Sequence, residues 1–528
     1  MRKFIGITIG PICDTIGEAS TPAALWFASS LFSDITKRIC EKIHKEYADV
    51  TIYSPYYAED IKMDDGIGKF HDRIIFSVSD FSDEKMKAII EEVKENTVSV
   101  FPQVEEFQNE KAKAFFKEYL QIHYVVKKEE QIDASNCVLA LSRYLDSLEL
   151  MKTFPKDDSE NPIRKLFLGE DKNGNKYIKN SVLFNRVTDA SNQLKNEEGN
   201  IWAVNEIATA HGKLKNSFKR KDYYAVVSAD GDGMGKFLEK LSSDRVRDFS
   251  KCCLAYAQEA AELIGAYGGM TIYAGGDDLL FLAPIMTDTD DIFRLCNSIQ
   301  KLFGDKLAGQ FNGIEQLPTI SFGISIQYRK YPLYEALANA SRLLALAKKD
   351  GDFANTTAQK NNMMIELQKH SGQSLSLLVA NDSYDVWKQI LQLGNDLSNE
   401  QRTITSVLYV LDNFASLIAV LNQEVEKTGI SLESYQNRWS NFFDNVDQTK
   451  ADAYIKGISE FYYTNLVVGK ERILVPEYSL RSNYITVEKD TGIGDKSLLA
   501  LIYLLKLKQF LKEGEGERNE VSGKNETP

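Results

Sequence analysis

The stretch that decides how this chain folds is MTIYAGGDDLLFL, residues 270–282. Two short apolar runs flank Gly275-Gly276-Asp277-Asp278, a pattern that predicts a β-hairpin whose glycines supply the positive φ angles of a tight turn. Neighbouring carboxylates at a hairpin tip can hold a hard divalent cation such as Mg²⁺, and such sites usually handle nucleotide phosphates. A plain polar turn would explain these four residues equally well, so the rest of the sequence has to decide.

A second acidic element follows a buried-strand pattern at residues 223–229. The chain runs from that strand directly into DGDGMGK, residues 230–236, and a helix is expected to begin near Phe237. Asp230 then ends the strand, and the glycine-rich backbone can approach a triphosphate at a helix N-terminus that favours anions. A calcium loop also begins Asp-x-Asp-Gly, but its twelfth position, here Leu241, has to be a glutamate. We therefore reject a calcium loop and expect both acidic elements at one sheet edge.

The elements around the hairpin predict one scaffold. Helical patterns cover residues 250–265, 290–303 and 332–348, and strand patterns cover residues 319–326 and 363–367. The resulting order, β-α-α-β-β-α-β-α-β, is typical of a ferredoxin-like palm, on which many polymerases and nucleotide cyclases place two metal-binding acids.

Four motifs in this region resemble one family. In chain order they are Asp-Gly-Asp-Gly-Met-Gly-Lys, Gly-Gly-Asp-Asp, Ser-Phe-Gly-Ile-Ser at residues 321–325, and a helix ending Leu-Ala-Lys ahead of HSGQ at residues 370–373. Residues 221–373 thereby resemble the large polymerase–cyclase subunit of type III CRISPR effector complexes, nearest to the Cmr type (III-B). The GGDEF diguanylate cyclases are similar more distantly, through the hairpin and the helix end at Ala347-Lys348.

The N-terminal residues resemble the first palm domain of the same family. A strand at residues 4–11 ends in Gly-Pro, a helix with Leu-Trp-x-x-Ser-Ser at residues 25–30 follows, and residues 65–76 continue the likeness. The resemblance implies an α+β fold with two ferredoxin-like palms, an α/β linking domain and a C-terminal helical bundle. The expected bounds are 1–135 for the first palm (acceptor side), 136–220 for the linking domain, 221–380 for the second palm, 381–512 for the helical domain and 513–528 for a disordered tail.

The resemblance also implies roles for individual residues. Catalysis and metal binding would fall to Asp230, Asp277 and Asp278, which would hold two Mg²⁺ or Mn²⁺ ions on a donor ATP. Further nucleotide contacts would come from Gly231, Asp232, Gly233, Met234, Gly235, Gly275, Gly276 and Lys348. The acceptor-side candidates are Gly10, Pro11, Ser29, Ser30 and Arg73. Two alternatives stay open: Asp232 as a turn residue, and Lys348 as a solvated lysine favoured by the helix dipole.

The implied reaction is nucleotidyl transfer from ATP with loss of pyrophosphate, started by target-RNA recognition, and it would make an antiviral second messenger. Relatives that polymerise ATP carry a basic run before the Leu-Trp helix, but this chain has no Lys or Arg between Lys3 and Lys37. Since a second triphosphate wants cationic partners, we expect S-adenosylmethionine as the acceptor, as in relatives that join it to AMP. Cyclic oligoadenylate from ATP alone, an inactive scaffold subunit and a stand-alone GGDEF-like cyclase are the alternatives.

Other features of the sequence argue against several classes. The first palm begins at residue 1 and the pair His71-Asp72 lies in its turn, so we expect neither an HD nuclease domain nor nuclease activity. The six cysteines form no Cys-x-x-Cys pair, which argues against zinc. A net charge of −13 argues against a protein that coats nucleic acid, so sister subunits would supply most contacts to guide and target RNA. No signal sequence or membrane span is evident, since the apolar residues 404–421 fit a buried helix within 401–425, and we expect a cytoplasmic protein.

Overall fold

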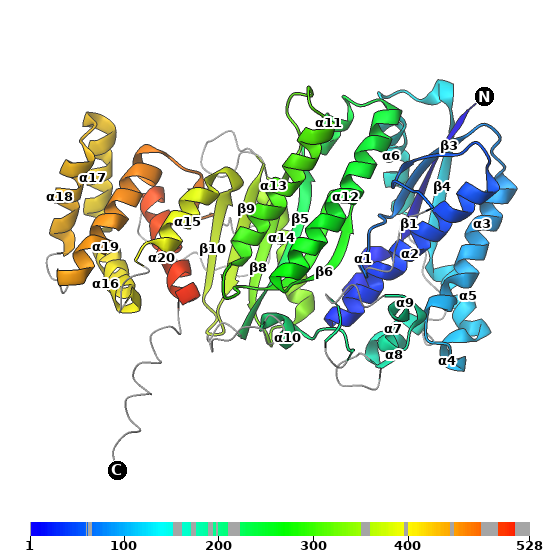
Figure 1. Ribbon diagram of the computed structural model, residues 1–528, viewed down its shortest axis with the longest axis horizontal. Helices are drawn as coiled ribbons and strands as arrows, with labels where there is room; N and C mark the ends of the chain where they lie inside the picture. Colours follow the sequence, from blue (N-terminus) through cyan, green and yellow to red (C-terminus); the bar gives the residue numbers. More distant parts are fainter. Residues whose placement is uncertain are drawn as a thin grey trace, which may run out of the picture. The chain divides into compact units, whose positions relative to one another are not determined.

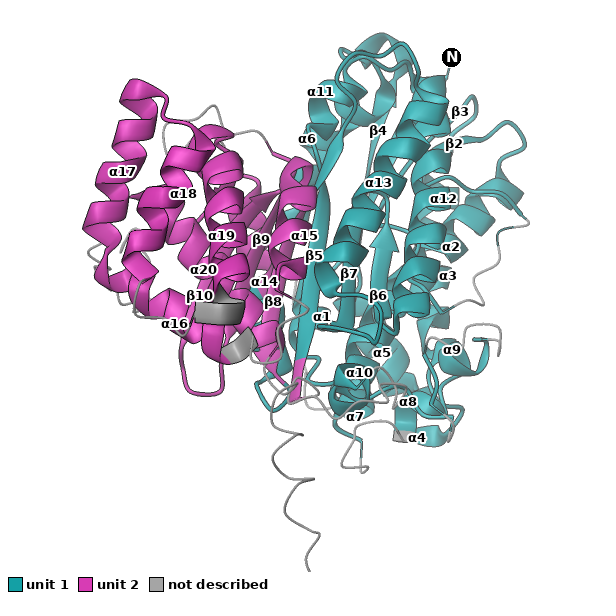
Figure 2. Cartoon of the chain, turned by 60° about the vertical axis from the view of Figure 1, so that its left-hand side comes forward, with its two compact units in different colours: residues 1–214, 224–320, 329–339 teal, residues 215–223, 321–328, 340–528 magenta. Residues whose placement is uncertain are grey.

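A computed structural model of the chain describes residues 2–59, 61, 66–151, 161–169, 176–187, 194–196, 199–209, 222–349, 360–394, 400–443, 448–476 and 495–512. The chain divides into two compact units (Figure 2). Unit 1 holds residues 1–214, 224–320 and 329–339, and unit 2 holds residues 215–223, 321–328 and 340–528. The polar run at residues 170–175, whose Asn and Gly residues predict a hairpin in the linking domain, and the tail expected at residues 513–528 lie outside the described residues.

The first palm, in unit 1, is built on a four-stranded antiparallel sheet with the order β2-β3-β1-β4 (Figure 1). Alternate residues of β1 face opposite sides, so Phe4 and Gly6 meet Leu141 and Leu145 of α6, while Ile5 and Ile7 are buried on the other face. The strands are β1 (Lys3–Gly10), β2 (Thr51–Ser54), β3 (Arg73–Val78) and β4 (Gln121–Lys128). The helices are α1 (Ile12–Gly17), α2 (Pro22–Glu46), α3 (Asp83–Asn96), α4 (Glu105–Gln108), α5 (Glu110–Tyr119) and α6 (Cys137–Glu149).

The residues at the N-terminus of helix α2 explain why the helix begins there. The Thr21 hydroxyl accepts a hydrogen bond from the Ala24 N–H, and Pro22 occupies the first turn, where its missing N–H costs nothing. The helix contacts β1 and β3 of its own sheet and also β6 of the second palm. Short helices follow in the linking region: α7 (Pro162–Leu168), α8 (Lys176–Lys179), α9 (Val182–Asn185) and α10 (Val204–Ala208).

The second palm supplies three antiparallel strands to unit 1, in the order β5-β7-β6. This order repeats β1-β3-β2 of the first palm, so the two palms use one strand scheme. Helices α12 and α13 pack side by side and α12 covers β6 and β7 (Figure 1). The elements are β5 (Tyr223–Asp232), α11 (Met234–Leu238), α12 (Ser243–Tyr267), β6 (Met270–Gly275), β7 (Asp278–Pro284) and α13 (Ile292–Gln310).

Unit 2 contains a sheet segment with the order β11-β10-β9-β8, in which β8 and β9 are parallel and β9 and β10 antiparallel. A Cβ atom placed on Gly323 of β8 would lie 2.2 Å from the Ala340 carbonyl oxygen, so glycine lets helix α14 pack its backbone on the strand. The elements are β8 (Thr319–Tyr328), α14 (Leu333–Ala347), β9 (Asn362–Gln368), β10 (Ser374–Ala380) and β11 (Ile473–Leu474).

The C-terminal part of unit 2 is helical, as expected. The order β-α-α-β-β-α-β-α-β of the second palm is confirmed, and the α+β fold with it. The helices are α15 (Tyr384–Gln392), α16 (Glu400–Asn413), α17 (Ala415–Thr428), α18 (Leu432–Ser440), α19 (Gln448–Phe461), the π-helical turn Tyr462–Val468 and α20 (Lys496–Lys512).

The expectation of one buried helix over residues 401–425 is wrong. The chain bends by 78° between α16 and α17, where the Asn413 side chain donates to the Tyr409 carbonyl and competes with the helical ladder. Tyr409 is 71% and Val420 60% exposed, so this pair is not buried all round. Within the described residues, no single helix has the length and apolarity to cross a membrane, and the bent pair passes only by length and composition.

Lys508 gives a test of how the helical part of unit 2 is held together. Its side chain is fully buried, and its ammonium donates to the carbonyls of Ile390 at 2.9 Å and of Leu393, at the C-terminal end of α15. Lys508→Met removes both hydrogen bonds and should cost about 1.5–3 kcal/mol locally. Amide hydrogen exchange of α15 should therefore accelerate by about 10- to 100-fold. Lys506→Met, on the same helix, is the control and should change exchange by less than about threefold; equal effects would contradict the assignment.

Candidate active site

The hairpin predicted at residues 270–282 is present, and its turn is as short as a hairpin allows. Gly275 pairs with Asp278, which leaves Gly276 and Asp277 as the two turn residues. Gly276 has a φ angle of 69°, a conformation that glycine adopts without a steric penalty. The turn therefore places Asp277 at the tip and Asp278 at the first position of β7.

Strand register brings a third carboxylate to the hairpin. The pairing of β5 with β7 runs up to Ala229 opposite Leu279. Asp230 and Asp278 stand one position beyond this pair and so face each other across neighbouring strands. Opposed residues of antiparallel strands project to the same face with Cβ atoms about 4.5–5.5 Å apart. Asp230 is half-buried and Asp278 is exposed, so the pair opens towards solvent.

Asp277 takes a different position, against the backbone of the Asp-Gly-Asp-Gly segment. A Cβ atom placed on Gly231 would lie 2.5 Å from Oδ2 and 2.9 Å from Cβ of Asp277. A residue with a side chain at position 231 would therefore displace the carboxylate. On the α12 side, burial raises the pKa of the Cys253 thiol and of the Tyr256 phenol well above their usual values, and the charge of Asp277 adds to both shifts.

The rest of the Asp-Gly-Asp-Gly segment shapes the turn into α11. Asp232 is 4% exposed and accepts a hydrogen bond of 3.0 Å from the Thr319 hydroxyl, which ties the end of β5 to the beginning of β8. Gly233 has a φ angle of 72° and caps α11. That helix begins at Met234, three residues before the expected start near Phe237, because the left-handed glycine turns the chain directly into it. Gly235 lies in its exposed first turn.

The oxygen-only donor set at the hairpin suits a hard divalent cation. Mg²⁺ in nucleotide sites is commonly held by one or two carboxylates together with substrate phosphates and water. The opposed Asp230 and Asp278 provide such a pair. Among the described residues, no group of three or more His, Cys, Asp or Glu side chains is arranged to hold a metal without further ligands.

A turn of the first palm contacts the hairpin, and no local sequence pattern indicates this contact. The Ala274 N–H donates to the Gly68 carbonyl at 3.0 Å, and Gly68 and Tyr273 form a β-bridge. A Cβ atom on Gly68 would lie 2.5 Å from the Ser29 hydroxyl. The structure thus places Ser29, an expected acceptor-side residue, beside the first-palm turn that is bonded to β6.

His71 lies next to the Gly276-Asp277 turn. Its ring is 3.9 Å from the position of a Cβ atom on Gly276, its Nε2 is 2.9 Å from the Ser54 hydroxyl, and its Nδ1 accepts from the Arg73 N–H. Burial, together with the smaller effect of the neighbouring Arg73 charge, lowers the pKa of His71 to about 4. The ring is therefore neutral at physiological pH and donates to Ser54.

The remaining acceptor-side candidates, Arg73, Gly10, Pro11 and Ser30, occupy separate positions in the first palm. The guanidinium of Arg73 pairs with Glu149 at 2.7 Å and with Asp146 at 2.6 Å, both on α6. Gly10 ends β1 and Pro11 precedes α1. Ser30, one residue after Ser29, lines a separate cavity on another face of α2.

Lys348 belongs to unit 2 and directly follows α14. The Asn362 side chain donates to the Ala347 carbonyl at 2.9 Å, which closes the end of that helix. The Lys348 N–H continues the helical ladder to Leu344 at 3.1 Å. The lysine is thus held at a defined helix end.

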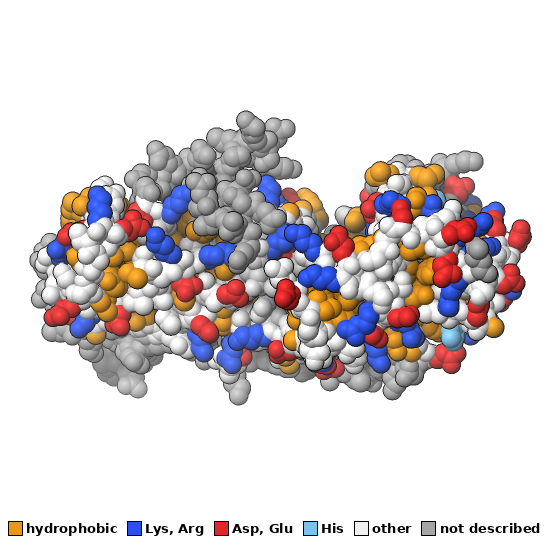
Figure 3. Space-filling model, turned by 90° about the horizontal axis from the view of Figure 1, so that it is seen from above, with side chains coloured by type: hydrophobic (Ala, Val, Ile, Leu, Met, Phe, Trp, Pro, Cys, Tyr) orange, Lys and Arg blue, Asp and Glu red, His pale blue; other side chains and the backbone are white. Residues whose placement is uncertain are grey.

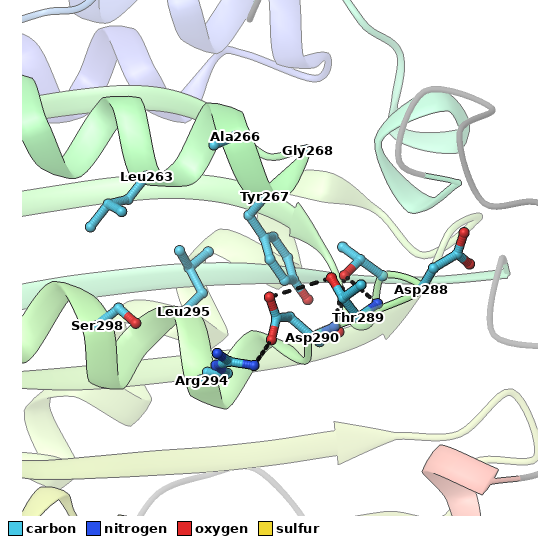
Figure 4. A pocket seen from close by; sticks show the side chains of 11 residues that line it. Leu263, Ala266, Tyr267, Gly268, Asp288, Thr289, Asp290, Arg294, Leu295 and Ser298 are labelled. Atoms are coloured by element: carbon cyan, nitrogen blue, oxygen red, sulfur yellow. Dashed lines mark hydrogen bonds and ion pairs between the residues drawn. The ribbon is translucent and has the colours of Figure 1, made fainter.

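A second cavity, outside the hairpin, lies away from these carboxylates. Its volume is about 420 Å³, and it opens between the end of α12 and the beginning of α13 (Figure 4). The Tyr267 hydroxyl donates to the Pro284 carbonyl, at the opposite end of β7 from Asp278. On the rim, Arg294 pairs with Asp290. The cavity therefore takes no part in the candidate site.

Comparisons with known proteins agree on one family. Residues 223–358 match the family model described as Cas10/Cmr2, second palm domain, and residues 4–135 match the model for the N-terminal part of the CRISPR-associated protein Cmr2. The CRISPR system Cmr subunit Cmr2 of Pyrococcus furiosus is 28% identical over 222 residues. That match covers 36% of this chain and 24% of the relative, so the matched part spans about a quarter of that protein.

One solved structure at a TM-score of 0.50 shows the same fold. The crystal structure of a Csm1–Csm4 cassette in complex with AMPPNP has a TM-score of 0.50 and 15% identity, and the match covers 87% of this chain and 69% of that chain. The apo cassette has a TM-score of 0.48 and 14% identity, over 96% of this chain and 69% of that chain. From its matches to these two family models, the chain belongs to the Cas10/Cmr2 family of type III CRISPR subunits and is of the Cmr type.

Proposed function

We propose that this chain is the messenger-synthesising subunit of a Cmr-type effector complex. Recognition of target RNA by the complex would start nucleotidyl transfer from ATP with release of pyrophosphate. The observation that carries the proposal is the strand register that sets Asp230 opposite Asp278 at a hairpin tip, in a chain with both palm domains of the family. The Csm1–Csm4 cassette crystallised with AMPPNP supports nucleotide binding on this fold.

The carboxylates would act together with a divalent cation. Asp230, Asp277 and Asp278 would hold Mg²⁺ or Mn²⁺ on the triphosphate of ATP, where the ions supply charge stabilisation at the α-phosphate and a lower pKa of the acceptor hydroxyl. Gly231 lets the Asp277 carboxylate seat against the strand end, and the Gly233 turn brings backbone N–H groups of α11 towards the phosphates. Lys348 would contact the triphosphate from the end of α14.

We propose S-adenosylmethionine as the acceptor that receives AMP. An acceptor ATP would bring a second triphosphate, which needs cationic partners. The segment from Phe4 to Thr36 contains no Lys or Arg, and the guanidinium of Arg73 is committed to Glu149 and Asp146. Cyclic oligoadenylate made from ATP alone is the second candidate, because Lys69 of the Gly68 turn supplies one cation on that side.

We further propose that the chain works inside a complex with sister protein subunits, guide RNA and target RNA. On the face shown in Figure 3, basic and acidic side chains are interspersed. Such a surface fits a chain that receives RNA contacts from partners. The exposed apolar residues of α16 and α17 fit protein docking by the helical domain, where Tyr409, Phe414, Leu417 and Val420 are 38–71% exposed.

The first test is the product formed by the assembled complex. With target RNA, Mg²⁺ or Mn²⁺, ATP and S-adenosylmethionine, mass spectrometry should find AMP joined to S-adenosylmethionine. Omitting target RNA should abolish it. Oligoadenylates made from ATP alone would support nucleotidyl transfer by this chain but contradict S-adenosylmethionine as the acceptor. The absence of product under every condition would favour a scaffold subunit.

Removal of a hairpin carboxylate should stop synthesis. Asp278→Asn keeps the shape of the side chain but removes the charge that would hold the cation, so the rate should fall on the order of a thousandfold. Asp288→Asn, in the exposed loop beyond β7, is the matched control and should leave the rate unchanged. A similar fall in both variants, or in neither, would count against the assignment.

Gly231→Ala tests the seat of Asp277 by steric means alone. The added methyl group would meet the carboxylate at 2.5 Å and force it aside, so synthesis should fall by about a hundredfold with little change in thermal stability. Gly304→Ala, in α13, meets no atom within 4 Å and should keep full activity. An active Gly231→Ala enzyme would show that the position of Asp277 does not matter.

A further inference from the structure

A small cavity of about 90 Å³ lies between α2 of the first palm and residues 183–187. Its wall includes Trp26, Ser30, Asp34 and Lys37, which recur at helical spacing on one face of α2, and Arg186, which follows α9. The volume is several times the roughly 15 Å³ that one water molecule needs. The Trp26 indole N–H donates to the Gly66 carbonyl at 2.6 Å, which fixes the wall on that side.

The hydroxyl of Ser30, which lines this cavity, is available as a hydrogen-bond donor. It is 7% exposed, and its hydroxyl finds no hydrogen-bond partner among the residues that the structure describes. A buried hydroxyl without a partner is unfavourable, so such a group marks a place that a ligand or water completes. The neighbouring Ser29 lies against Gly68, so the two serines contact different parts of the first palm.

The charges around the cavity sum to a positive value. Both oxygens of Asp34 are engaged, Oδ1 by Arg186 at 3.0 Å and Oδ2 by Arg38 at 2.6 Å. Arg38 also donates to the Asn96 carbonyl and to Ser99, away from the lining residues. Arg186 and Lys37 therefore face the cavity against the single carboxylate of Asp34.

Glu41, outside the lining, is the remaining charge to consider. Its carboxylate lies 3.6 Å from the Lys37 ammonium, longer than a strong charge-assisted hydrogen bond, and its side chain is 36% exposed. The pair is thus weak and leaves the Lys37 charge available to a ligand.

We propose that this cavity binds a small oxyanion of the size of inorganic phosphate. The Ser30 hydroxyl would donate one hydrogen bond, and Arg186 would offer the N–H groups that Asp34 leaves unused. Lys37 would add charge at the side. The proposal does not rest on messenger synthesis, because the cavity and its charges are separate from Asp230, Asp277 and Asp278.

Isothermal titration of the full-length chain with inorganic phosphate tests the site, with chloride holding ionic strength constant. The wild-type chain should show saturable binding of one phosphate. Ser30→Ala should weaken binding by at least about tenfold, the value of one hydrogen bond to a charged group. Arg186→Gln should weaken it further, whereas Arg164→Gln, which removes a surface arginine paired with Glu18, should leave binding unchanged.

Three results would overturn the proposal. They are the absence of saturable binding to the wild-type chain, equal affinity in the wild-type and Ser30→Ala chains, and equal weakening by Arg164→Gln. Equal affinity in all four chains would identify an adventitious ion only. If Arg186→Gln unfolds because it leaves Asp34 with one partner fewer, the Ser30→Ala chain alone decides, since loss of a hydroxyl leaves the Asp34 ion pairs intact.

Discussion

The antiparallel register between β5 and β7 is the constraint on which the candidate site depends. It alone sets Asp230 opposite Asp278, because these residues come from strands joined through α12 and the hairpin. A slip of one residue would send one of the two carboxylates to the other face of the sheet. Gly231 reinforces the register sterically, since the Asp277 carboxylate occupies the space that any side chain there would need.

The same register occurs in the first palm, with other residues at its end. Thr8 pairs with Arg73, and the Ile9 N–H then donates to the Asp72 carbonyl at 3.0 Å. His71-Asp72 therefore occupy the place that Asp277-Asp278 occupy in the second palm, and Ile9 stands where Asp230 stands. The first palm lacks the opposed pair of carboxylates for this reason. His71 is better explained as a neutral packing ring beside the hairpin than as part of a nuclease site.

Local chemistry explains which features could be predicted from the sequence. The Gly276-Asp277 turn and the palm order follow from turn residues and from periodicity that neighbouring residues supply. The contact of Gly68 with Ala274 joins segments about 200 residues apart, and no local pattern encodes it. Strand β10 was missed because the run up to Ala380 is buried on both faces and does not alternate. The bend before Phe414 coincides with a side-chain hydrogen bond of Asn413, which the apolar periodicity of the segment does not reveal.

The arrangement of the carboxylates would link the binding of the cation to the binding of the nucleotide. Mg²⁺ takes six oxygen ligands in a nearly octahedral arrangement, and the described residues offer no cluster of three acids that could supply half of them. Phosphate oxygens and water would have to complete the shell. Cation and nucleotide would then stabilise each other's binding by the same free energy, as linkage requires. The first palm would enter this linkage through Gly68, which is hydrogen-bonded to the hairpin, and through His71, which lies beside its turn. A shift of that first-palm turn would therefore change the site without altering a single carboxylate.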